Sequence, residues 1–270
     1  MKIALLLTGQ LRTFKMCGHL VKNMILDHYD VDVFMSINKS NKLQTTNLYN
    51  TKYTENEDIQ EALNFYKPIT YFINENYDKE FCKLVIDPVI IENMPEMIIK
   101  LCLEQYFIVK KAYELLINHI KKTDQKYDAV IRLRYDQFIW DDNNISHLLS
   151  VQKGQKNNIL YNEFNTNILI REKSKLKIDI PLENNVYVFG FGDFTNYKYV
   201  NDQFWIHSND LIDTFYKFYD EILDITLECT QNIFPKNGCY FEHCLYQFLI
   251  RHKIQYHKSQ AHGDFVREIN

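Results

Sequence analysis

Residues 1–140 alternate short apolar segments with amphipathic ones, and this alternation constrains the fold more than any other feature. The segments typical of strands are Lys2–Leu7, Asp30–Ile37, Ile69–Asn74 and Tyr127–Trp140. The segments typical of helices are Phe14–His28, Ile59–Tyr66 and Pro95–Lys122. Strands that alternate with helices favour a parallel sheet with right-handed crossovers. The sequence therefore predicts an α/β fold with a mostly parallel central sheet flanked by helices.

The longest helical pattern, Pro95–Lys122, begins with a proline, which suits the first turn of a helix. Apolar residues recur along it every three or four positions and predict one core-facing stripe, formed by Ile98, Cys102, Tyr106, Val109, Tyr113, Leu116 and Ile120. Gln105, Tyr106 and Lys110 would contact a nucleotide if this helix flanked a binding pocket. The alternative is a packing helix with a solvated basic end.

After Trp140 the pattern is less regular. The expected elements are a short helix in Asp141–Gln155, strands at Asn158–Ile170, Asn185–Phe191 and Ile254–His257, helices at Leu211–Leu223 and Phe241–Lys253, and a polar tail over Ser259–Asn270. No internal repeat and no low-complexity linker divides the chain. We therefore expect residues 1–270 to form one domain with two intimate halves, 1–140 and 141–270.

The composition limits the kind of partner and the compartment. The chain is 46% hydrophobic and 24% charged with a formal net charge of -4, which argues against nucleic acid as the main partner. The six cysteines are scattered and form no CxxC pair, so reduced thiols in the cytoplasm are expected. The apolar run Ile3–Leu7 is too short for a signal peptide, and no stretch approaches a membrane span.

The clearest strand, YDAVIRLRYDQFIW, carries charge on one face. Alternation places Ala129, Ile131 and Leu133 on one side, and Val130, Arg132, Arg134 and Asp136 on the other. An edge strand carries two arginines at little cost, whereas an unpaired cation in a central strand is expensive. A carboxylate at the carboxyl end of a strand is placed to reach a ligand or its metal, so Asp136 marks the expected active centre. The alternative is an edge strand with a self-paired Arg/Asp surface.

A glycine follows the first predicted strand in Thr8-Gly9-Gln10-Leu11-Arg12. A glycine at this position lets backbone N–H groups approach a ligand, and Arg12 could reach a phosphate or a base. The segment is neither GxGxxG nor a P-loop, so those cofactor motifs are excluded. A simple strand-to-helix turn is the alternative.

Other catalytic motifs are absent, which weighs against several enzyme classes. The sequence has no GxSxG, no HExxH and no kinase motif set. What remains is a set of charged residues at predicted loop ends: Arg12, Arg132, Arg134, Asp136, Asp202, Glu242 and His262. Such a set suits a nucleoside diphosphate with a divalent metal that offsets its charge. A second carboxylate could take the proton from an attacking hydroxyl.

Four segments together resemble GT-A-type glycosyltransferases, in particular those of large DNA viruses and the WavE-like polysaccharide-synthesis proteins. They are LLLTGQLRTF, YDAVIRLRYDQFI, NDQFWIHSNDLIDTFYKFY and FEHCLYQFLIRHKIQYH. The resemblance implies a single GT-A-like domain with a nucleotide-binding half, 1–140, and a smaller acceptor-side half, 141–270. It implies transfer of a sugar from a nucleotide-diphosphate sugar, first of all a UDP-sugar, to a hydroxyl of a glycan or glycoprotein. A viral member would act in the host cytoplasm.

The same resemblance assigns the donor site. The nucleotide-sugar would face Thr8, Gly9, Gln10, Arg12, Arg132, Arg134 and Asp136. Such enzymes end the fourth strand with a D-x-D motif that holds Mn²⁺ or Mg²⁺. Here Arg134 replaces the first carboxylate and only Asp136 matches, which puts metal dependence in question. Arg134 could itself neutralise phosphate as a fixed cation.

The resemblance also offers candidates for the base and for a second metal ligand. Glu242 opens a late helix where relatives carry an acidic base, although His243 stands where many carry a second acid. Asp202 is the rival base. His257 or His262 would complete the metal shell. The alternatives are a helix-terminal charge for Glu242 and a turn residue for Asp202.

Two other functions stay open at this point. A broken D-x-D motif also fits a non-catalytic nucleotide- or glycan-binding protein that kept the fold. A nucleotidyltransferase on a similar α/β sheet is the third possibility.

Overall fold

The computed structural model describes most of the chain in ten ranges. These are residues 1–11, 14–39, 56–75, 96–141, 175–178, 181, 183–194, 197–232, 240–259 and 261–265. The predicted strand Asn158–Ile170 and most of the predicted helix in Asp141–Gln155 lie outside these ranges, as does Arg12.

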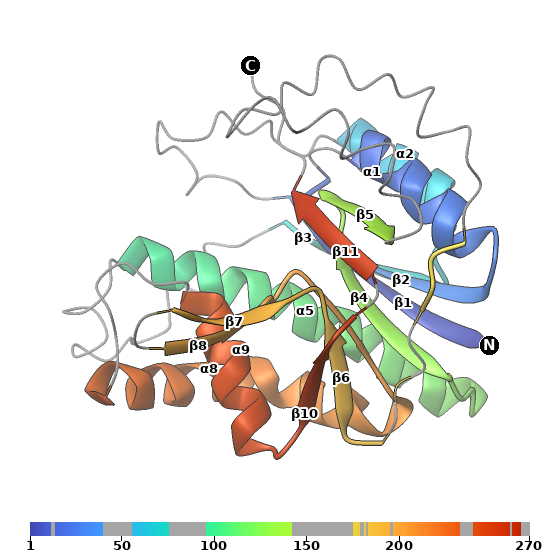
Figure 1. Ribbon diagram of the computed structural model, residues 1–270. Coiled ribbons are helices and arrows are strands. Elements are labelled where there is room, and N and C mark those ends of the chain that lie inside the picture. The colour runs from blue at the N-terminus through green and yellow to red at the C-terminus, as the bar shows by residue number, and fades with distance from the viewer. Residues whose placement is uncertain are drawn as a thin grey trace, which may run out of the picture.

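Seven strands of the described chain form one central sheet (Figure 1). They are β1 (Lys2–Gly9), β2 (Asp30–Asn38), β3 (Thr70–Asn74), β4 (Ala129–Arg134), β6 (Asn185–Val188), β9 (Phe204–His207) and β10 (Gln255–Lys258). Their order is β10-β6-β9-β4-β1-β2-β3, and only β9 runs antiparallel to its neighbours. The predicted α/β fold with a mostly parallel sheet is confirmed, and strands from both halves of the chain build the one sheet.

Helices cover both faces of this sheet (Figure 1). They are α1 (Phe14–Val21), which continues as a π-helical turn (Lys22–Leu26), α2 (Asn56–Tyr66), α5 (Glu96–Thr123), α8 (Ile212–Asn232) and α9 (Tyr240–Arg251). The helices α1 and α2 pack on one face, and α5, α8 and α9 pack on the other. None of the described helices has the length and apolar character of a membrane span.

The period-two pattern of β1 divides its side chains between the two cores. Ile3, Leu5 and Leu7 join the core under α1 and α2, whereas Ala4 and Leu6 join the core under α5. The strand β4 follows the same rule and is apolar toward α1. Its even-numbered residues, and with them both arginines, therefore project toward α5.

Three features differ from the sequence-based expectations. The segment Tyr127–Trp140 is not one strand, because the chain turns at Tyr135 and Asp136 and continues as β5 (Gln137–Asp141) in another sheet. The expected polar tail contains β11 (Ala261–Phe265), which pairs antiparallel with β5. A small hairpin of β7 (Phe191–Phe194) and β8 (Tyr197–Val200) lies between β6 and β9 in the chain.

A buried hydrogen-bonded chain connects β9 to α5. Trp205 Nε1 donates to the hydroxyl of Tyr113 at 2.9 Å, and this hydroxyl lies 2.6 Å from His207 Nε2. His207 Nδ1 lies 2.6 Å from the carbonyl oxygen of Ser208, so Nδ1 is the protonated nitrogen and Nε2 accepts from Tyr113. The chain is complete only when the imidazole is neutral. Burial lowers the pKa of His207 from 6.5 to about 4.

This burial predicts a pH-dependent stability. The unfolded chain protonates His207 below pH 6.5, whereas the folded protein does so only near pH 4, so the unfolded state binds more protons between these values. The free energy of unfolding should therefore fall as the pH drops through this window, by about 1 kcal/mol per pH unit from this residue. Urea denaturation at a series of pH values should show that the free energy of unfolding depends less steeply on pH in H207Q than in wild type. A slope in H207Q equal to that of wild type and of the exposed-site control H257Q would contradict the assignment.

Candidate functional site

The order of the strands reverses between β1 and β4. From β1 the chain passes through α1 to β2 on one side, and from β3 it returns through α5 to β4 on the other side of β1. In open α/β sheets, ligands bind at the carboxyl ends of the strands beside such a reversal. Thr8 and Arg134 are direct register partners at this edge. The predicted donor-site residues of β1 and β4 therefore lie side by side.

Gly9 ends β1 in a conformation that favours glycine. Its φ is +111°, and a side chain at this position would meet no atom within 4 Å. The backbone is thus exposed to space at the reversal point, while the flanking Thr8 and Gln10 are buried. A ligand can approach the main chain here more closely than at a residue with a side chain.

Arg132 is a buried cation on a central strand, which the sequence pattern did not favour. Its side chain is 1% exposed, yet Nε donates to Thr8 Oγ1 at 3.0 Å and another nitrogen donates to the carbonyl oxygen of Asp202. The guanidinium also lies 4.6 Å from the ring centre of Trp205. Burial lowers the pKa of Arg132 to about 10, so the side chain stays charged at neutral pH. These partners are why β4 tolerates the arginine without being an edge strand.

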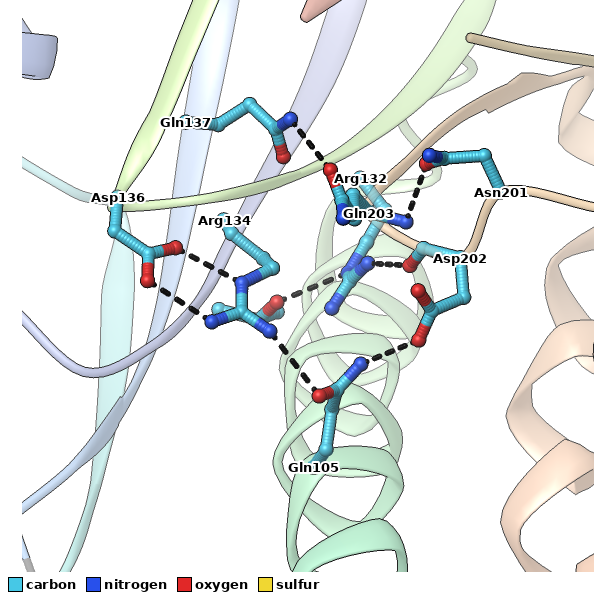
Figure 2. Close-up of polar contacts among 9 residues, drawn as sticks. Gln105, Arg132, Arg134, Asp136, Gln137, Asn201, Asp202 and Gln203 are labelled. Atoms are coloured by element: carbon cyan, nitrogen blue, oxygen red, sulfur yellow. Dashed lines mark hydrogen bonds and ion pairs between the residues drawn. The ribbon is translucent and has the colours of Figure 1, made fainter. Parts of the chain in front are cut away.

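Arg134 and Asp136 form a bidentate ion pair at the end of β4 (Figure 2). Nε and a terminal nitrogen of Arg134 each lie 2.9 Å from one carboxylate oxygen of Asp136. The Asp136 side chain is 4% exposed and that of Arg134 is 19% exposed. Burial alone would lower the pKa of Arg134, but the neighbouring Asp136 outweighs it and raises the pKa above its ordinary value. The self-paired alternative for this segment is thus observed, at a central strand instead of an edge.

Gln105 of α5 links this pair to Asp202 (Figure 2). Its amide oxygen accepts from Arg134 at 3.1 Å, and its amide nitrogen donates to the carboxylate of Asp202 at 2.6 Å. The Tyr106 hydroxyl lies 3.4 Å from the same carboxylate oxygen. Gln105 and Tyr106 therefore both contact Asp202, and their contact with a nucleotide stays a prediction. Lys110 instead pairs with Asp220 of α8, at 2.6 Å.

Two glutamines that carry no signal in the sequence lie beside this network (Figure 2). Gln137 donates to the amide oxygen of Gln203 at 2.9 Å, and the Gln203 backbone donates to Asn201 at 3.0 Å. The side chain of Gln137 is buried, and its amide oxygen has no hydrogen-bond partner in the part of the chain that the structure describes. Glutamine has no diagnostic spacing, so only the turn after β4 reveals these residues.

A second polar cluster lies at the carboxyl ends of β2 and β3. Asn38 donates to the carboxylate of Glu104 on α5, and Asn74 donates to Asn38 at 3.3 Å. All three side chains are buried. The cluster fixes α5 against the sheet close to Gln105, and no sequence motif marked it.

The remaining predicted residues lie on other elements. Glu242 is partly exposed in the first turn of α9. His262 belongs to β11, where its backbone pairs opposite Trp140. His257 lies in β10, at the level of Ile131 but three strands away from β4, and it contacts Asn185 at 2.7 Å. This distance, roughly 14 Å at the usual strand spacing, removes His257 from the surroundings of Asp136.

The pairing of Asp136 within the described ranges weighs against the expected Mn²⁺ or Mg²⁺. Mg²⁺ and Mn²⁺ take several oxygen ligands, with carboxylates foremost among those from the protein. Within the described ranges, no group of three or more His, Cys, Asp and Glu side chains could hold a metal ion. Both oxygens of Asp136 already accept hydrogen bonds from Arg134. The metal roles of Asp136 and His262 stay predictions.

No family model and no curated protein matches the chain. Among solved structures it is similar to a glycosyltransferase involved in the glycosylation of the major capsid of PBCV-1, with 10% identity, 96% of this chain and 81% of the other covered, and a TM-score of 0.35. It is also similar to a protein assigned as a glucose-1-phosphate thymidylyltransferase from Bacillus anthracis, with 9% identity, coverage of 97% and 89%, and a TM-score of 0.35.

The bond between Thr8 and Arg132 gives a direct test of the buried network. T8V keeps the shape of the side chain but leaves the buried Nε of Arg132 without its acceptor, and we expect a loss of about 1–3 kcal/mol in the free energy of unfolding. T8S keeps the hydroxyl and should lose only about 1 kcal/mol, the cost of a buried methyl group. Urea denaturation of the two variants checks this. A T8V variant as stable as wild type would show that the bond contributes nothing.

Proposed function

We propose that this protein is a glycosyltransferase that moves a sugar from a nucleotide-diphosphate sugar, with UDP-sugars the first to test, to a hydroxyl of a glycan or glycoprotein. The observation that carries this proposal is the arrangement at the reversal between β1 and β4. Gly9 ends β1 there, and the neighbouring β4 carries Arg132 and Arg134, each held by hydrogen bonds. Exposed backbone and fixed cations at such an edge suit a diphosphate.

The proposed donor position follows from charge. A diphosphate leaving group gains negative charge as the sugar is transferred, so cations fixed beforehand stabilise the transition state more than the ground state. Arg134 is the partly exposed cation of the network, and Arg132 lies behind it as a second, buried charge. In this proposal Arg134 faces the phosphates, and the backbone at Gly9 contacts the nucleotide.

The two candidate bases differ in how far they are buried. Asp202 is buried and accepts hydrogen bonds from Gln105 and Tyr106. Glu242 is partly exposed at the start of α9. A general base has to reach the hydroxyl of an incoming acceptor. We therefore propose Glu242 as the base and Asp202 as a positioning residue that holds Gln105.

A nucleotide screen tests the donor class. A ligand that binds only the folded protein stabilises it by about 2.7 kcal/mol at a concentration near 100 times its Kd, which raises the melting temperature measurably. We expect nucleoside diphosphates and their sugar conjugates to raise the melting temperature, with and without Mn²⁺ in the buffer. A preference for nucleoside triphosphates would favour a nucleotidyltransferase. Binding of UDP without any hydrolysis or transfer from UDP-sugars would favour a non-catalytic nucleotide-binding protein.

Replacement of the proposed base separates chemistry from donor binding. E242Q should lower the rate of transfer by about 10²- to 10⁴-fold, the usual contribution of a general base, and leave the affinity for UDP unchanged. E228Q changes a carboxylate on α8 that pairs with Arg251, and it serves as the control. Mass spectrometry of the acceptor product measures the rates. Full activity in E242Q, with activity lost in a folded D202N, would assign the base to Asp202 instead.

A further inference from the structure

In the ion pair at the end of β4, the positive group is more exposed to solvent than the negative group. The guanidinium of Arg134 is 19% exposed, whereas the carboxylate side chain of Asp136 is 4% exposed. Figure 2 shows the two carboxylate oxygens of Asp136 directed at Arg134. An ion that approaches from solvent therefore meets a positive group first, and this arrangement suits an anion better than a divalent cation.

A metal ion at Asp136 would have to replace an existing partner. Both carboxylate oxygens are engaged by Arg134 at 2.9 Å, in the geometry that guanidinium and carboxylate groups prefer. Removing one partner of a buried ion pair leaves an uncompensated charge, which is strongly unfavourable. In the described chain no further His, Cys, Asp or Glu cluster would share such an ion.

Arg134 is also held in one direction. Gln105 accepts from a terminal nitrogen of Arg134 at 3.1 Å, and Asp202 in turn fixes the Gln105 amide at 2.6 Å. A guanidinium is planar and carries five N–H groups, so a single arginine can bind a carboxylate and a phosphate at the same time. The neighbouring Asp136 also raises the pKa of Arg134, so the guanidinium is charged at neutral pH.

We propose that Arg134, oriented by Asp136 and Gln105, supplies the positive charge at the donor diphosphate, and that donor binding in this protein does not require a divalent cation. This inference rests on the proposed use of a nucleotide-diphosphate donor. It replaces the metal expected from the resemblance with a charge that belongs to the chain. Asp136 then has a positioning role and is not a metal ligand.

Calorimetric titration with UDP, in excess EDTA or in excess MnCl₂, tests the inference. Wild type should bind UDP with the same affinity in both buffers. R134Q should bind about 10- to 100-fold more weakly in both, because a hydrogen-bonded charge contact is lost. R134K keeps the positive charge but loses the planar guanidinium, so its affinity for UDP should lie between those of wild type and R134Q. The control R251Q removes an arginine that pairs with Glu221 and Glu228, and it should bind as wild type does.

A variant designed to require a metal ion for UDP binding makes the test sharper. R134D places two carboxylates two positions apart, so UDP binding should vanish in EDTA and return with Mn²⁺. R134Q and R134K carry the test if R134D fails to fold, and thermal unfolding identifies that case. UDP binding by wild type that needs Mn²⁺ would overturn the inference and leave the proposed function intact. Failure of every nucleoside diphosphate to bind in either buffer would overturn the proposed function and the inference together.

Discussion

The structure depends on the pairing of buried positive charge along β4. Burying an unpaired cation in the middle of a sheet would destabilise the fold by more free energy than most local interactions contribute. Arg132 is instead bonded to Thr8 on β1 and to the main-chain oxygen of Asp202 just before β9. Arg134 is bonded to the carboxylate that follows it in the turn and to an amide of α5. Two side chains thus connect four segments that lie far apart in the sequence, so the same contacts that make the charges tolerable also assemble the site.

The antiparallel strand β9 is the part of the sheet that this pairing explains best. Arg132 and Trp205 are direct register partners, and the guanidinium lies over the indole ring. The indole nitrogen then continues into the buried chain through Tyr113 to His207. A strand with this sequence supplies both a surface for the cation and hydrogen bonds to α5. The second half of the chain therefore completes the sheet beside β4 instead of forming a separate unit.

Local periodicity predicted the first half of the fold well, since β1 to β3 and α5 begin and end within a few residues of the expected positions. It failed where the pairing is long-range. The segment Tyr127–Trp140 reads as one continuous strand, and nothing in it marks the turn at Asp136. The polar segment Ala261–Phe265 has no apolar alternation, and its partner β5 lies more than a hundred residues earlier in the chain. A strand that owes its existence to such a partner cannot be recognised from its own sequence.

The site was predictable to the extent that parallel strands bring their carboxyl ends to one edge, which placed Thr8 beside Arg134. Partner choice was not predictable, because Asp136 could serve a metal, a phosphate-bound water or an arginine until the turn fixed its direction. Gln105 was only a conditional candidate, and Gln137 and Gln203 carried no signal at all. Of these, Gln105 helps to set the direction of Arg134, because this guanidinium is bonded to Gln105 on one side and to Asp136 on the other. Preorganisation of this kind stabilises a developing charge without reorientation during the reaction. The residues without an ionic signature therefore decide how the ionic ones can act.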